Sequence, residues 1–330
     1  MTTTFQKVLP PAGLLSDDDV LPQLQSWQAM GQRTALVTLV GVEGGAPRQP
    51  GAQMAVAEDG SYAGYLSGGC LEQVVVFEAQ AVIKEGRNRL VRYGKGSPYF
   101  DVKLACGGGL DVYFDQAIGP ALVSDVLERR SQRQTCILRT NLATGASTVA
   151  SLETGATSHQ GILRDGVFER NYPGRLRLVL LGSGPALTGM AALATATGIE
   201  LSIPAGDDLT RAEIIAAGLG DRLAGGIPFD TLERLDEATA AVLYFHAHDQ
   251  EPDLLFQILK SKCFYIGALG NHAVHRERLA VLAARGCSPT DLARIRAPVG
   301  LIAGAKSTAT LAVGVLAELM IEAKALNYVA

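Results

Sequence analysis

The chain has 330 residues, of which 48% are hydrophobic and 19% are charged, and its formal net charge is -4 at pH 7. This length and composition can supply two hydrophobic cores, so we expect two globular domains. The slightly acidic balance lacks the broad basic surface of nucleic-acid-binding proteins, so we expect no nucleic-acid partner.

The amino-terminal segment and the cysteines indicate a cytoplasmic protein. Residues 1–20 lack a basic start followed by an apolar core and carry three successive aspartates, which is unlike a signal peptide. No apolar run of membrane-spanning length is free of charges. The five cysteines are odd in number and scattered, which fits a reducing compartment better than a disulfide framework.

Residues 1–173 predict an α+β domain. Ser16 and Asp19, followed by an apolar stripe at Val20, Leu24 and Trp27, predict a capped amphipathic helix. The elements expected after it are a strand at 33–42, a hairpin of 53–57 and 62–66 turning at Asp59-Gly60, a helix over 71–85, two short strands around Cys106 with alternation at 110–114, a helix over 120–130, and strands at 135–140 and 147–152.

Two motifs that combine glycine with cysteine dominate this half: Ser67-Gly68-Gly69-Cys70-Leu71-Glu72 and Cys106-Gly107-Gly108-Gly109. Glycine lets the backbone approach a ligand closely and adopt positive φ. The first motif precedes the helix over 71–85, whose apolar stripe is Leu71, Val74, Val75, Ala79 and Val82. A helix start favours anions and lowers the pKa of a cysteine. The alternative is that Cys70 is a small buried core residue.

Residues 174–330 predict a Rossmann-like doubly wound domain after a linker at 171–174. A buried strand at 177–181 leads into Gly182-Ser183-Gly184, a helix to Ala196 and a second strand at 199–203. The fingerprint is incomplete, because Leu187 stands at the third glycine position and Pro204 precedes the acidic Asp207. A nucleotide or NAD(P) is therefore an alternative cofactor rather than the expected one.

Two further clusters follow buried strands of this domain. The strand at 240–245 ends in His246-Ala247-His248-Asp249, which could bind a metal ion or form ordinary hydrogen bonds, since no further ligand is specified. The strand at 264–269 precedes a helix start with His272, His275, Arg276 and Arg278, which could meet a phosphate or form a solvated face.

Together, these motifs closely resemble the xanthine dehydrogenase accessory (XdhC/CoxI) family, over roughly residues 27–319. The segments that carry the resemblance are 45–54, 67–72, 92–94 and 106–108 in the first half and 182–184, His248-Asp249 with Asp253, 265–270 and 296–301 in the second. The departures are Leu187, Pro204 and Asn271-His272, and they concern the nucleotide role of the second domain.

The resemblance implies a maturation factor for molybdenum hydroxylases, a cofactor-binding chaperone rather than a turnover enzyme. Such a protein binds the molybdenum cofactor (molybdopterin), supports its sulfuration and inserts it into an apo molybdenum hydroxylase such as xanthine dehydrogenase. A cysteine desulfurase and a second copy in a homodimer are the other implied partners. No resident metal ion is expected.

The implied site residues lie mainly in the glycine motifs. Cys70 and Cys106 are candidate thiols for the metal end of the cofactor or for sulfur relay, since soft thiolates suit such a metal. Arg48, between two prolines, could hold the phosphate or lie on the surface. The full predicted cofactor-binding set is Arg48, Ser67, Gly68, Gly69, Cys70, Glu72, Cys106, Gly107, Gly108, Gly182, Gly184, His248 and Asp249.

Two other classes of function compete with this interpretation. An NAD(P)-dependent oxidoreductase would bind pyrophosphate at Gly182 and Gly184, with Cys70 or His248 assisting. A thiol redox sensor would pair Cys70 with Cys106, provided that the sulfurs lie within disulfide reach.

Overall fold

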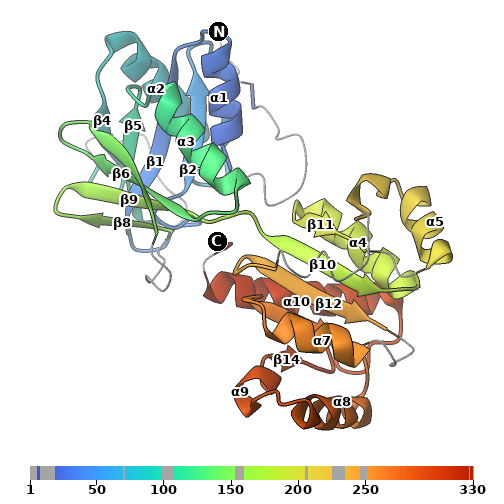
Figure 1. Ribbon diagram of the computed structural model, residues 1–330. Coiled ribbons are helices and arrows are strands. Elements are labelled where there is room, and N and C mark those ends of the chain that lie inside the picture. The colour runs from blue at the N-terminus through green and yellow to red at the C-terminus, as the bar shows by residue number, and fades with distance from the viewer. Residues whose placement is uncertain are drawn as a thin grey trace. The chain divides into compact units, whose positions relative to one another are not determined.

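The computed structural model divides into two compact units, Met1–Gly174 and Arg175–Ala330, which Figure 1 shows in ribbon form. The structure describes residues 6–7, 19–69, 71–97, 107–152, 160–204, 207–224, 235–245, 251–326 and 328–329. Among the helices in these ranges, none is long and apolar enough to cross a membrane.

Unit 1 contains a five-stranded antiparallel sheet, sheet A, in the order β3-β2-β1-β5-β4. Its strands are β1 Thr34–Glu43, β2 Gln53–Ala57, β3 Tyr62–Gly64, β4 Arg89–Gly94 and β5 Gly109–Asp115. Its helices are α1 Leu21–Ala29, α2 Glu72–Glu85 and α3 Pro120–Ser131. The strong turn signal Asp59-Gly60 does connect β2 to β3, as predicted.

Helix α2 packs its apolar face on sheet A and forms one core of unit 1 with it. Val75, Ala79 and Val82 are fully buried there as predicted, and Gly86 ends the helix in the left-handed conformation. The prediction for Val74 is wrong: its side chain is 37% exposed, and Val76 is buried instead. The buried face of α2 is therefore rotated away from Val74 and toward Val76, while it still includes the other predicted positions.

Helix α1 begins later than the sequence suggests. Its first residue is Leu21, its N-cap is Val20, and no side-chain hydrogen bond caps it; the predicted capping residue, Ser16, lies outside the described residues. Pro22, in the first turn, explains this start because proline fits where N–H groups lack helical partners. Leu21, Leu24 and Trp27 are buried in a second core, which includes residues of α3.

A second antiparallel sheet, sheet B, completes unit 1 in the order β7-β6-β9-β8. Its strands are β6 Cys136–Asn141, β7 Ser147–Ser151, β8 Gly161–Arg164 and β9 Val167–Tyr172. The β8-β9 hairpin was not predicted. The expected linker at 171–174 is wrong in its first half, because Asn171 and Tyr172 pair with β6 and are 6% and 4% exposed.

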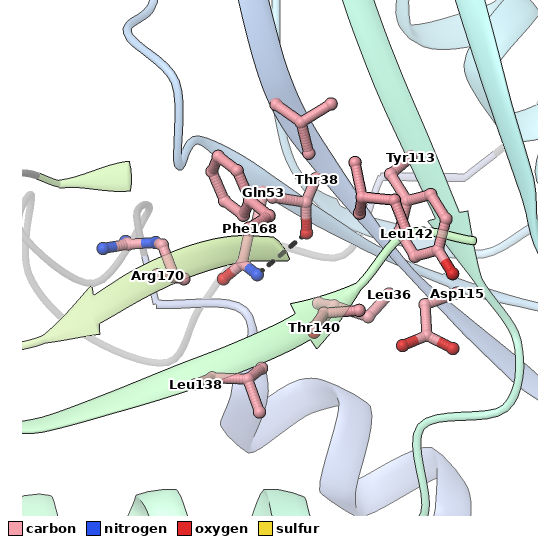
Figure 2. A pocket seen from close by; sticks show the side chains of 11 residues that line it. Leu36, Thr38, Gln53, Tyr113, Asp115, Leu138, Thr140, Leu142, Phe168 and Arg170 are labelled. Atoms are coloured by element: carbon pink, nitrogen blue, oxygen red, sulfur yellow. Dashed lines mark hydrogen bonds between the residues drawn. The ribbon is translucent and has the colours of Figure 1, made fainter. Parts of the chain in front are cut away.

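Sheets A and B face each other across a small cavity lined by polar and apolar side chains of both (Figure 2). The Tyr172 hydroxyl donates to Gln53 Oε1 at 2.7 Å, and Gln53 Nε2 donates to Thr38 Oγ1 at 3.0 Å. The cavity leaves only about 10 Å³ for the centre of a water molecule, which suits one water and no cofactor. This buried chain of hydrogen bonds therefore joins the two sheets rather than forming a ligand site.

Unit 2 is built on a parallel five-stranded sheet, sheet C, in the order β11-β10-β12-β13-β14. Its strands are β10 Arg177–Gly182, β11 Glu200–Ser202, β12 Thr239–Tyr244, β13 Tyr265–Ala268 and β14 Ile295–Arg296. Its helices are α4 Pro185–Thr197, α5 Asp208–Ala216, the 3₁₀ turn η2 Gly220–Arg222, α7 Glu251–Leu259, α8 His272–Ala284, α9 Pro289–Leu292 and α10 Thr308–Ala325.

The strand order of sheet C reverses between β10 and β12, which are paired neighbours: β11 lies on one side of β10, and the strands that follow lie on the other. Helices α7 and α8 pack on one face of the sheet, while α4 and α10 contact each other and the strands. In such doubly wound sheets, ligands bind beyond the carboxyl ends of the strands at this reversal point. Gly182 and Tyr244 end the two strands there.

We expect the Tyr172→Phe variant to lower the free energy of unfolding of unit 1 by about 1–2 kcal/mol, because the buried Gln53 oxygen loses its donor. The chain has a single tryptophan, Trp27, buried in unit 1. Urea unfolding followed by its fluorescence therefore reports this unit. An unchanged midpoint would show that the hydrogen bonds between the sheets contribute nothing.

Candidate functional site

The loops that carry the predicted site residues of unit 1 all leave sheet A at the same edge. Glu43, at the end of β1, pairs with Gly109 at the start of β5, and Gly94, at the end of β4, also pairs with Gly109. Gly64, at the end of β3, pairs with Met54 near the start of β2. The antiparallel register thus brings the described parts of three loops to one edge: residues 44–52, residues 65–69 with 71, and residues 95–97 with 107–108.

The loop at 44–52 contacts the other two. A Cβ added at Gly108 would lie 2.3 Å from the Gly45 carbonyl oxygen, so only glycine permits this backbone contact. Further along the same loop, the Arg48 guanidinium carbon lies 4.4 Å from the centre of the Tyr65 ring. The two glycine motifs are thus linked through one segment, and we treat this edge of sheet A as the candidate site.

The Glu72 carboxylate is the centre of the loop at 65–71. It accepts hydrogen bonds from the Ser67 hydroxyl and from five backbone N–H groups, at distances between 2.7 and 3.2 Å; the N–H donors are those of Leu66, Ser67, Gly68, Gly69 and Leu71. Glu72 is only 5% exposed and is the first residue of α2. An acidic side chain is also favoured there by the helix dipole.

These donors keep Glu72 ionised despite its burial. Burial by itself raises the pKa of this carboxyl, but the hydrogen bonds from Ser67, Leu66 and the neighbouring backbone outweigh it and lower the pKa below the ordinary 4.5. The loop therefore contains a permanent buried negative charge at neutral pH.

The glycines of this loop have conformations that suit the arrangement. Gly68 and Gly69 have φ of +81° and +120°, which L side chains rarely adopt, and the space beside each is open. Their N–H groups, which the sequence suggested for an anionic ligand, point instead to Glu72. The expected anion-binding geometry is present, but the anion is a side chain of the protein. A contact between this loop and a cofactor stays a prediction.

The second glycine motif lies beside a network of paired charges. Arg92 forms ion pairs with Glu43 and with Asp111, the latter at 2.8 Å, and Lys95 lies 2.8 Å from Glu43. Lys95, followed by Arg92, lowers the pKa of the Glu43 carboxyl. These two cations are thus already balanced by carboxylates at this end of the edge.

A different group of cations surrounds Tyr65. Lys7 Nζ lies 5.6 Å from the ring centre, in addition to the Arg48 guanidinium; Lys7 is exposed and Arg48 is partly exposed. Residues 6–7 are fixed by backbone contacts with β3, since the Tyr62 N–H donates to the Gln6 oxygen at 3.1 Å. Sequence reasoning identified Arg48 but not Lys7 or Tyr65, and no local pattern connects residues so far apart.

In unit 2, N–H groups of the predicted glycine turn also donate hydrogen bonds to acceptors of the protein itself. Gly184 N–H donates to Thr210 Oγ1 at 2.9 Å, and Ser183 N–H donates to the Tyr244 oxygen at 3.1 Å. Asp207 accepts from both the N–H and the hydroxyl of Thr210, which lower the pKa of its carboxyl. Gly182 is needed for close packing, because a Cβ there would lie 2.4 Å from the Tyr244 oxygen. Pyrophosphate would have few donors left at this turn.

The helix start after β13 corrects a further expectation. Arg278 is neither on a solvated face nor available for phosphate, because it forms a buried ion pair with Glu251 at 2.7 Å, with both side chains 3% exposed. Asn271 caps the helix by accepting from the N–H groups of Ala273 and Val274. His272 is exposed.

Several predicted residues lie outside the described residues. They are Cys70, Cys106, His246, His248 and Asp249. The structure therefore tests neither the proposed thiol pair nor the histidines after β12. Within the ranges that it describes, no group of three or more His, Cys, Asp or Glu side chains could hold a metal ion.

Comparison with known proteins identifies both halves of the chain. A profile described as the XdhC and CoxI family matches residues 27–94, and one described as the XdhC Rossmann domain matches residues 178–319. The molybdenum cofactor insertion chaperone PaoD of Escherichia coli (strain K12) is 36% identical over 288 residues, which are 87% of this chain and 83% of PaoD. The chain belongs to the XdhC and CoxI family.

Two more distant similarities concern a curated protein and a solved structure, and the second of them bears on the fold alone. A protein of Bacillus subtilis (strain 168) described as a probable xanthine dehydrogenase subunit is 24% identical over 327 residues, covering 88% of this chain and 93% of that relative. A crystal structure described as a xanthine dehydrogenase from Bacillus halodurans superimposes with a TM-score of 0.73 at 22% identity, covering 92% of this chain and 95% of the other. The predicted family and fold class are confirmed.

We expect the Glu72→Gln variant to unfold unit 1 at lower urea concentration, with a loss of about 2–3 kcal/mol at pH 7, because an amide leaves several buried N–H donors unsatisfied. The lowered pKa means that the unfolded state binds more protons between the folded pKa and 4.5. The contribution of Glu72 is thus complete above 4.5 and is lost as the pH falls through the folded pKa.

Trp27 fluorescence measures this loss, and the Glu78→Gln variant is the matched control on the same helix. Glu78 pairs with a partly exposed arginine, Arg89, so the control should cost less than about 1 kcal/mol. Equal losses in the two variants, or a loss at Glu72 that is independent of pH, would contradict the assignment.

For the Rossmann domain, we expect NAD and NADP to bind more weakly than about 10 μM, because Thr210 and Tyr244 already accept the N–H groups of the glycine turn. Isothermal calorimetry on the full chain measures this. Submicromolar binding of either dinucleotide, abolished in a Gly184→Val variant, would show that the turn opens for pyrophosphate.

Proposed function

We propose that this member of the XdhC and CoxI family binds the molybdenum cofactor, supports its sulfuration and inserts it into an apo molybdenum hydroxylase of the xanthine dehydrogenase type. The observation that carries the proposal is the identity with a molybdenum cofactor insertion chaperone over most of both chains. A cofactor handled in this way is cargo, which the protein receives and releases, so the chain acts as a chaperone rather than as a turnover enzyme.

The edge of sheet A supports this function in unit 1. Three loops meet there, and open space lies beside the glycines of two of them, at Gly68, Gly69 and Gly107. Gly108 holds the second motif against the loop that carries Arg48. A large, flat, anionic ligand needs such a surface of exposed backbone with charged groups beside it.

In this proposal, the residues divide between two ends of the cofactor. Cys70 and Cys106, in the two glycine motifs, face the metal end as ligands or as a sulfur relay, since thiolates bind soft metal centres and carry sulfur as persulfides. A cysteine desulfurase would supply that sulfur. Ser67, Gly68, Gly69 and Glu72 shape the first loop, and Gly107 and Gly108 shape the second.

Ligand binding by the Rossmann domain has less support than cofactor binding at the edge of sheet A. Gly182 and Gly184 lie at the reversal point of sheet C, where His248 and Asp249 also follow β12 in sequence. A nucleotide or NAD(P) at this point is the alternative proposal, together with an oxidoreductase activity. The internal hydrogen bonds of the turn favour a structural role, and a homodimer is a further part of the proposal.

We expect the Cys70→Ser, Cys106→Ser double variant to fold normally but to fail in reconstituting an apo molybdenum hydroxylase. Serine nearly preserves shape but removes the polarizable thiolate. The measurement is recovered hydroxylase activity with cofactor preloaded on each variant. Cys136→Ser is the control, because this thiol is fully buried and burial raises its pKa to about 11. Full activation by the double variant would mean that both thiols are structural.

A further inference from the structure

The buried charge of Glu72 determines which part of the site can accept a phosphate. The N–H groups of residues 66–69 and 71, in the loop before α2, already bind the carboxylate. A phosphate monoester carries a charge of about −1.5 to −2 at neutral pH, so it would be repelled by the ionised carboxylate at close range. These five N–H groups are therefore taken by the carboxylate, and the buried negative charge beside them disfavours a phosphate.

The cations at the other end of the edge do not offer an equivalent site. Arg92 and Lys95 share the carboxylates of Glu43 and Asp111. A phosphate there would compete with two acidic side chains of the protein. A second pair of cations, Lys7 and Arg48, lies on the Tyr65 ring at the same edge.

Lys7 and Arg48 are well placed for an anion. Tyr65 precedes the glycine motif by two residues in the chain, and its ring holds the two cations at 5.6 and 4.4 Å from its centre. Cation–π contact orders both side chains before a ligand arrives. A guanidinium can bind two phosphate oxygens at once, while an ammonium adds a compact charge. Backbone contacts with β3 fix the position of Lys7.

We propose that Lys7 and Arg48, held against the Tyr65 ring, bind the terminal phosphate of the pterin cofactor, and that the backbone N–H groups of residues 66–69 and 71 do not. This inference rests on the proposed function of cofactor binding. It assigns Lys7 a binding role and makes Tyr65 a positioning residue.

The experiment compares binding of an oxidised, fluorescent pterin derived from the cofactor in two forms, with its terminal phosphate and after phosphatase treatment. The full-length chain is titrated as wild type, as the Lys7→Ala, Arg48→Ala double variant, and as Tyr65→Leu and Tyr65→Phe. The matched control is Lys84→Ala, Arg87→Ala, which removes two exposed cations near the other end of α2. Trp27 fluorescence verifies folding of each variant.

We expect the double variant to bind the phosphorylated form at least about tenfold more weakly, while its affinity for the dephosphorylated form stays unchanged. Tyr65→Leu should show the same selective loss to a smaller degree, and Tyr65→Phe should bind like wild type because its ring still holds the cations. The control pair should bind both forms normally. Added salt should weaken binding of the phosphorylated form in the wild type more than in the double variant.

If the wild type binds the phosphorylated form, two results for the Lys7→Ala, Arg48→Ala variant overturn the inference alone. One is an equal loss of affinity for both forms of the pterin, and the other is no loss of affinity for the phosphorylated form. A wild-type chain that binds neither form overturns the proposed function as well as this inference, so the two failures are distinguishable.

Discussion

The Glu72 carboxylate is the interaction on which the site depends. It gathers five N–H groups and one hydroxyl into a loop that contains two glycines at positive φ. Without an acceptor, the buried N–H groups of Leu66 and Leu71 and the partly buried donors between them would be unsatisfied. An external anion could accept the same hydrogen bonds. A carboxylate that belongs to the chain, however, keeps the loop in one conformation whether or not a ligand is bound, because it cannot dissociate.

Unit 2 satisfies the donors of its glycine turn in a similar way. This turn lies where doubly wound sheets bind phosphate, yet Thr210 accepts the Gly184 N–H, and Asp207 in turn accepts the Thr210 hydroxyl. In both units, a glycine-rich turn before a helix is closed by a side chain of the protein itself. A glycine pattern therefore predicts the turn geometry reliably, while the identity of the acceptor depends on contacts that the local pattern does not contain.

Most elements could be predicted from the sequence, because alternation, helical spacing and Asp59-Gly60 are local signals. The β8-β9 hairpin also has such a signal, Asp165-Gly166, where both residues have positive φ. Recognising this turn would have placed Tyr172 in the strand that follows it and not in a linker. Local patterns could not show that Val74 is exposed, since a small rotation of the buried face preserves the helical periodicity. Nor could they show that Arg278 meets Glu251, because that contact depends on the packing of α7 against α8.

The meeting of the site loops follows from strand order rather than from any motif. Antiparallel pairing places the carboxyl ends of β1, β3 and β4 beside the starts of β2 and β5, so segments near residues 48, 68 and 108 become neighbours although long stretches of chain separate them. The edge also becomes polarised: a buried carboxylate lies under the first glycine motif, paired charges lie beside the second, and two cations lie on Tyr65. In the proposed complex, this distribution would orient a ligand that is anionic at only one end, because its charged end is favoured at Tyr65 and disfavoured over Glu72.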